Sequence, residues 1–138
     1  IMLATDPDFK VGVRVAGTQQ IGILSGRGSK RAELQLLDNQ KIVKVGDVLL
    51  ARGSTNNRPF VPGIPVGIIS AVDSTAGSIA QTATVMLYPN FSALGVVSVV
   101  LSAGKNNPGD ALVPTAPQPT PVPTVTIFAT PTPTATTK

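Results

Sequence analysis

The chain has 138 residues, a formal net charge of +4, no cysteine and no histidine. Disulfides, thiolate or imidazole metal ligands and Ser-His-Asp catalysis are therefore excluded, and we expect no cofactor. Only 13% of the residues are charged, which falls short of the dense basic surface typical of nucleic-acid binding, so we expect no nucleic-acid partner.

The first half of the chain predicts three short β-strands. Residues 10–16 alternate valines with polar or small residues, which is the period of a half-buried strand. Residues 21–24 form a short apolar run that a glycine-rich turn at 26–29 ends. Residues 31–37 alternate again, so a third strand is expected there.

The second half predicts further strands at 48–51, 65–72, 79–88 and 95–101. The last of these could be read as a helix, but its four valines favour a strand. No helical periodicity runs through the chain, and the strands recur at a spacing of about ten residues. Six or seven short strands in this arrangement indicate an all-β barrel or sandwich.

The composition changes after about residue 106. Eight of the 13 prolines lie from Pro108 to Pro133, and threonine is the commonest companion. Such a segment buries too little apolar surface to offset its chain entropy. We therefore expect a domain at 1–105 and a disordered Pro/Thr-rich tail at 106–138.

Three weaker chemical signals remain open. Asp6 and Asp8 would offer two carboxylates to calcium, which usually takes six or more oxygens. Residues 25–31, SGRGSKR, would suit an anion, although a solvated hairpin turn is the simpler interpretation. A Ser-Lys hydrolase is compatible with the composition, but no S-x-x-K motif occurs.

The most distinctive stretch lies at residues 44–72. It contains GDVLLARG at 46–53 and FVPGIPVGIISAV at 60–72. This spacing of Gly-Asp, Phe, Pro-Gly and Pro-Val-Gly resembles the signature of the rod shape-determining protein MreC family. The resemblance extends over about residues 6–101 and is specific at residues 46–72.

The resemblance implies a small six-stranded β-barrel of chymotrypsin-like topology without catalytic residues, and therefore no enzyme. It implies a scaffold of the bacterial cell-wall elongation machinery that maintains rod shape. The implied partners are a class B penicillin-binding transpeptidase, the membrane protein MreD and further copies of the chain, in dimers or filaments. It also implies the extracytoplasmic side of the cell membrane, with a single-pass anchor outside this sequence, since no apolar run here approaches the ~20 residues of a membrane span.

Two groups of residues in the stretch are candidates for a site. The first group shapes the backbone and comprises Gly46, Asp47, Pro62, Gly63, Pro65 and Gly67. The second group offers a contact surface and comprises Phe60, Asn56, Asn57 and Arg58. The other interpretation of Phe60 is that its ring fills one end of the barrel core. A wall- or glycan-binding β module, suggested by the basic body and the tail, is the alternative function.

Overall fold

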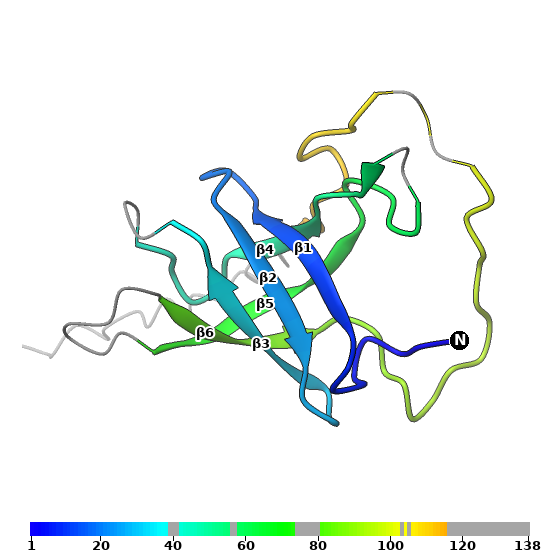
Figure 1. Ribbon diagram of the computed structural model, residues 1–138, viewed down its shortest axis with the longest axis horizontal. Helices are drawn as coiled ribbons and strands as arrows, with labels where there is room; N and C mark the ends of the chain where they lie inside the picture. The colour runs from blue at the N-terminus through cyan, green and yellow to red at the C-terminus, as the bar shows by residue number, and fades with distance from the viewer. Residues whose placement is uncertain (39–41, 56–57, 74–80, 103, 105, 116–138) are drawn as a thin grey trace, which may run out of the picture.

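Six antiparallel β-strands form a closed barrel in the computed structural model, which describes residues 1–38, 42–55, 58–73, 81–102, 104 and 106–115 (Figure 1). The strands are β1 (Lys10–Val15), β2 (Ile21–Gly26), β3 (Arg31–Leu36), β4 (Val48–Ala51), β5 (Pro65–Asp73) and β6 (Thr82–Leu87). Around the barrel they follow the order β1-β2-β3-β6-β5-β4, and β4 pairs with β1 to close it. The all-β, six-stranded barrel predicted above is confirmed.

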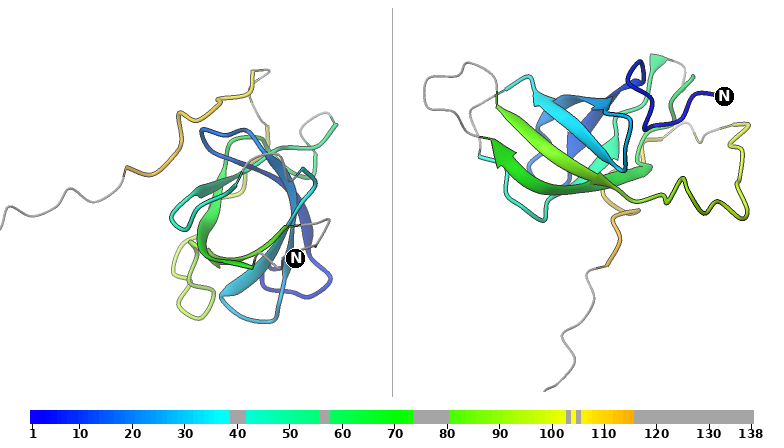
Figure 2. Two further views of the ribbon diagram at one scale, coloured as in Figure 1. Left: turned by 90° about the vertical axis from the view of Figure 1, so that its left-hand side faces the viewer. Right: turned by 90° about the horizontal axis from the view of Figure 1, so that it is seen from below.

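The core fills the inside of the barrel because apolar residues alternate along every strand. Val13, Leu34, Leu49 and Val85 are each 0% exposed. The valine alternation of β1 and the leucine alternation of β3 therefore point inward, as the sequence predicted. The left view of Figure 2 looks along the barrel and shows the strands arranged in a ring.

The two ends of the barrel differ in what covers them. One end, here called the groove end, gathers the starts of β1, β3 and β5 and the ends of the other three strands. Residues 1–9, 52–55, 58–64 and 88–100 extend from it, and Phe9 and Phe60 pack there against the core. The opposite end, here called the far end, carries the β1–β2 turn and residues 37–38 and 42–47, of which Val43 is buried in the core.

The predicted strand at 95–101 is wrong. Residues 95–101 follow β6 as an exposed segment with no strand pairing, and Val96 is 95% exposed. The physical reason is that a closed barrel leaves no free edge. β6 already pairs with β3 and β5, so the backbone of a seventh strand has no neighbour to bond.

Other boundaries shift by a few residues. β2 runs two residues further than predicted because Ser25 and Gly26 pair with Glu33 and Ala32 of β3. The strand predicted at 79–88 covers Thr82–Leu87, and residues 79–80 lie outside the described part. Most of the predicted tail, residues 116–138, also lies outside it, so its disorder stays a prediction.

Pro108, Gly109 and Asp110, on the tail side of the predicted boundary, contact the barrel. The change of composition at 106 is therefore not where contact with the barrel ends. Within the described ranges, no helix has the length and apolar character needed to cross a membrane.

Candidate protein-docking groove

The Gly46-Asp47 turn directly precedes β4 and is hydrogen-bonded to the neighbouring strand β5. Gly46 has a φ of 99°, a left-handed conformation that glycine adopts without steric cost. The Asp47 carboxylate accepts a hydrogen bond from the Lys44 N–H at 2.9 Å. The Gly46 N–H donates to the Ile69 carbonyl, and the Ile69 N–H donates to the Asp47 carbonyl, each at 2.9 Å. This turn lies at the far end and shapes the entry to β4.

The Pro62-Gly63 turn lies at the groove end and closes the loop of residues 52–64. Gly63 has a φ of 83°, and its N–H donates to the Ala51 carbonyl at 2.8 Å. Across the base of the loop, the Ser54 N–H donates to the Phe60 carbonyl, and the Phe60 N–H donates to Ser54 Oγ, both at 3.0 Å. These bonds fix where the loop leaves and rejoins the barrel.

Pro65 and Gly67 open strand β5. Pro65 stands opposite Leu50, beside a register shift between Leu49 and Leu50, where a missing N–H is tolerated. Gly67 lies against β6, and a Cβ added there would come within 2.4 Å of the Met86 carbonyl oxygen. Gly67 is therefore required by the close approach of two strands.

Phe60 has one side against the core and the other in solvent. Its ring packs edge-on against Phe9, with centroids 5.8 Å apart and planes at 89°. Both rings are partly buried against the core cluster. Arg58 is exposed, whereas the predicted contact residues Asn56 and Asn57 lie outside the described part of the chain. The packing of Phe60 agrees with the core interpretation, and its role as a contact residue stays a prediction.

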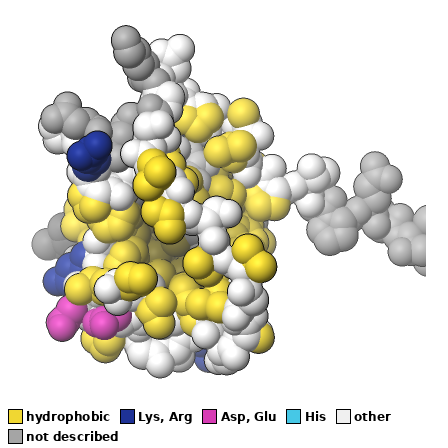
Figure 3. All heavy atoms as spheres, turned by 90° about the vertical axis from the view of Figure 1, so that its right-hand side faces the viewer, with side chains coloured by type: hydrophobic (Ala, Val, Ile, Leu, Met, Phe, Trp, Pro, Cys, Tyr) yellow, Lys and Arg dark blue, Asp and Glu magenta, His cyan; other side chains and the backbone are white. Residues whose placement is uncertain are grey.

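An apolar groove of about 800 Å³ lies beside Phe60 at the groove end. Three segments supply its walls: residues 1–11, residues 51–66, and residues 87–100. Figure 3 shows this face, where hydrophobic side chains surround a hollow and charged ones lie toward its edges. Among the described residues that line the groove, every one except Ser98 is apolar.

The groove suits an apolar protein surface better than a reaction. Exposed apolar patches of this kind mark interaction sites, and interfaces have aromatic anchors in an apolar centre. Catalysis would need ionisable or nucleophilic groups, and the described lining offers only the Ser98 hydroxyl.

The other sequence signals gain little from the structure. In the turn at 27–30, Arg27 forms an ion pair with Glu33, and Ser29 Oγ accepts from the Arg31 N–H at 3.2 Å. The positive charge of residues 25–31 is therefore partly neutralised. No group of three acidic, histidine or cysteine side chains is placed for a metal ion in the described ranges. Asp6 accepts from the Asp8 N–H at 2.9 Å, as in an ordinary turn.

A second feature, on the barrel wall, was not predicted from the sequence. Arg14 is only 5% exposed, and its guanidinium pairs with Asp110, 96 residues away. The only sequence signal is an arginine between two valines of an alternating strand. That pattern predicts an outward side chain but does not predict what covers it.

The comparisons with known proteins agree with this geometry. The family model "Rod shape-determining protein MreC, barrel core" matches residues 1–101. A solved structure titled MreC shares 24% identity and a TM-score of 0.50, covering 63% of this chain and 50% of its own. No curated protein sequence matches the chain significantly.

Two further solved structures have the same fold. MreC from Pseudomonas aeruginosa matches at 24% identity and TM-score 0.50, over 64% of this chain and 57% of its own. The complex of penicillin-binding protein PBP2 and MreC from Helicobacter pylori includes a match at 17% identity and TM-score 0.53, over 67% and 55%. The chain therefore spans between half and three-fifths of the length of these solved relatives.

Proposed function

The chain belongs to the family of the rod shape-determining protein MreC, and from this premise we propose that it is a non-enzymatic scaffold of bacterial cell-wall elongation. The family match over residues 1–101 carries the proposal. The apolar groove supports it, because a scaffold needs a surface that binds proteins and the groove lacks a reactive constellation among its described residues. The proposed location is the extracytoplasmic side of the cell membrane, held by an anchor outside this sequence.

The proposed partner at the groove is a penicillin-binding transpeptidase. The solved complex of a fold relative contains a penicillin-binding protein, and the groove presents Phe60 and Ile64 at the mouth of an apolar hollow. MreD and further copies of the chain are additional proposed partners. The glycan-binding alternative has less support, because Ser98 is the only described lining side chain that can hydrogen-bond a sugar.

A photocrosslinking experiment tests the groove directly. A photoreactive phenylalanine analogue replaces Phe60 in the full-length protein of the source cell, and the same analogue replaces Val45 as a control. Val45 is 65% exposed and belongs to the turn at the far end. We expect the transpeptidase to crosslink from position 60 and not from position 45.

A matched pair of substitutions completes the test. Ile64→Asp places a charge on a 39% exposed side chain in the groove, and Val45→Asp places the same charge at the far end. Co-purification of the transpeptidase should fall at least about tenfold with I64D, since a desolvated unpaired charge costs several kcal/mol, and should persist with V45D. Equal capture by both variants would refute the groove as the interface. No capture by the unmodified full-length chain would refute the transpeptidase as a partner.

A further inference from the structure

Arg14 is an outward-facing arginine that is nevertheless buried. The strand alternation directs Val13 and Val15 into the core and Arg14 to the outer wall of the barrel. Even so, the residue is 5% exposed, and its Nε has no hydrogen-bond partner within the described part of the chain. Arginine is almost never buried unless it is paired, so this position requires an anion beside it.

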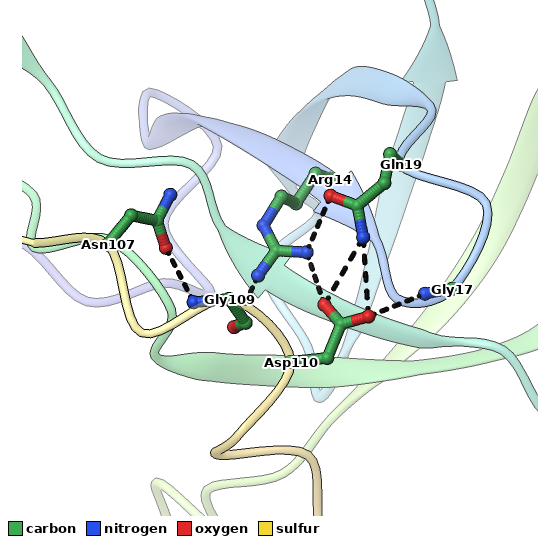
Figure 4. A network of polar contacts seen from close by, with 6 residues as sticks. All are labelled: Arg14, Gly17, Gln19, Asn107, Gly109 and Asp110. Carbon is green, nitrogen blue, oxygen red and sulfur yellow. Dashed lines mark hydrogen bonds and ion pairs between the residues drawn. The ribbon is translucent and has the colours of Figure 1, made fainter.

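Three donor groups converge beside that guanidinium (Figure 4). Arg14 Nη1, the Gly17 N–H and Gln19 Nε2 all donate to the carboxylate of Asp110, the last two at 2.9 and 3.3 Å. Gln19 Oε1 also accepts from Arg14 Nη1 at 3.0 Å, which holds the amide in place. Gln19 has a φ of 61°, the one left-handed non-glycine residue in the described part of the chain. A non-glycine residue in that conformation is uncommon, and such residues are held by their surroundings and cluster at functional sites.

The Asp110 carboxylate belongs to a compact turn. The Gly109 N–H donates to Asn107 Oδ1 at 3.0 Å, and the Ala111 N–H donates to the Pro108 carbonyl at 3.3 Å. Arg14 Nη2 donates to the Gly109 carbonyl. The arginine therefore binds both the backbone of the turn and the side chain of Asp110. The bond from Arg14 Nη1 to the Asp110 carboxylate is charge-assisted, and such bonds are stronger than those between neutral groups.

A second contact fixes the orientation of the turn. The Pro108 ring lies directly over Gly63, where an added Cβ would come within 2.3 Å of Pro108 Cγ. The turn therefore extends from the Pro62-Gly63 corner at the groove end to the β1–β2 turn at the far end. Gly63 contacts Pro108, and Arg14 binds Asp110 two residues further along the same turn.

We propose that Arg14, Gln19 and the Gly17 N–H form a carboxylate-binding site on the barrel wall, and that its ligand is the Asn-Pro-Gly-Asp turn of this chain, residues 107–110, bound in cis. The site binds a peptide in which an aspartate directly follows a Pro-Gly pair. An occupant on the same chain acts at an effective concentration of about millimolar. It therefore excludes external acidic peptides until it is removed.

Peptide binding in trans tests the site on the full chain. The probe is a fluorescent peptide of residues 106–114, and fluorescence anisotropy measures its binding to Asp110→Asn, to Asp8→Asn and to the unmodified chain. Asp8 is exposed and makes a matched control for the lost charge. We expect D110N to bind the peptide at least about tenfold more tightly than the other two proteins, because only its site lacks a carboxylate ligand.

Two companion measurements tie the binding to the named groups. The peptide should shift the NMR amide signals of Gly17 and Gln19 in D110N. A peptide with asparagine in place of the aspartate should not bind, and neither should the Arg14→Gln, Asp110→Asn double variant bind the acidic peptide. Circular dichroism confirms that each variant is folded.

Three outcomes would overturn the proposal. The unmodified chain could bind the peptide as tightly as D110N does, which would show that Asp110 does not occupy the site. D110N could leave the Gly17 and Gln19 signals unchanged from the unmodified chain and bind no peptide, which would show that the carboxylate is not recognised. Self-association that D110N abolishes would assign the turn to a second copy instead of the same chain.

Discussion

Gly67 shows how the absence of one methyl group sets the distance between two strands. Its Cβ position is 2.4 Å from the Met86 carbonyl oxygen and 2.9 Å from Val85 Cγ1. A backbone carbonyl in a closed barrel cannot move aside without disturbing the pairing of β5 with β6.

We therefore expect Gly67→Ala to lower the free energy of unfolding by about 1–3 kcal/mol, the usual cost of overpacking. Gly95→Ala is the control, because an added Cβ at Gly95 would meet no atom within 4 Å. It should change the free energy by less than about 0.5 kcal/mol, as at ordinary surface sites. Urea denaturation measures both, and a stable G67A variant would show that the strands are further apart than described.

The carboxylate of Asp110 gives a prediction on pH. Its hydrogen bond to Arg14, then its bond to the Gly17 N–H, lower its pKa below the ordinary 3.8. A lowered pKa means that the docked form binds fewer protons than the free form. Docking of the turn is therefore fully favoured above pH 3.8 and is lost as pH falls through the lowered pKa.

Carboxyl ¹³C NMR measures this directly. The pKa of Asp110 should lie below the ordinary 3.8, and Gln19→Ala should raise it toward that value, because the Gln19 amide donates to the same carboxylate. An Asp110 pKa at or above 3.8 in the unmodified chain would contradict the docked turn.

At the scale of elements, the segment 95–101 shows why a strand needs a neighbour as well as a suitable sequence. Its valines have strand propensity, yet the barrel is closed by the pairing of β1 with β4 and offers no edge. Val96 and Leu101 are 95% and 85% exposed and do not line the groove.

We expect the pair Val96→Ser and Leu101→Ser to leave the free energy of unfolding within about 0.5 kcal/mol of the unmodified chain. Leu87→Ala is the contrasting variant. Leu87 is 1% exposed, and its truncation should cost about 2–5 kcal/mol through the cavity that it leaves. Chemical denaturation compares the two, and a large loss from the serine pair would mean that the segment packs as a strand after all.

The sequence predicted those elements whose stabilising pattern lies within the element itself. Alternation fixed β1 and β3, and turn residues placed β4 and β5 to within a residue or two. The spacing of Phe60 from the Pro-Gly corner also singled out this residue in the sequence. The sequence could not predict that strands β1–β6 would use every edge, because pairing depends on the whole sheet. The burial of Arg14 was equally hidden, since the group that covers it comes from 96 residues away.

At the scale of the whole molecule, the barrel and the segments outside it should differ in how they open. Each of the six strands pairs with two neighbours around the ring, so losing one strand opens the whole core. Residues 94–101 have no backbone hydrogen bond in the described structure. Stability of this kind is distributed in cooperative units.

Hydrogen exchange should therefore separate two classes of amide. The core amides of β1–β6, such as those of Leu34 and Val85, should exchange together at the rate of global unfolding, while residues 94–101 exchange without protection. Graded protection along the barrel, with one strand opening well before the others, would contradict a single cooperative ring.

The docked turn also has a mechanical consequence. While Asp110 is held, the chain beyond it departs from the side wall of the barrel, and tension on that chain is borne by the Arg14 contact. When the contact opens, the load passes back along the chain toward β6, onto the residues that line the groove. The roughly 20 residues between β6 and Asp110 have an extended length of about 70 Å once they too leave the barrel. The site on the wall therefore limits how far the chain beyond β6 can extend under tension.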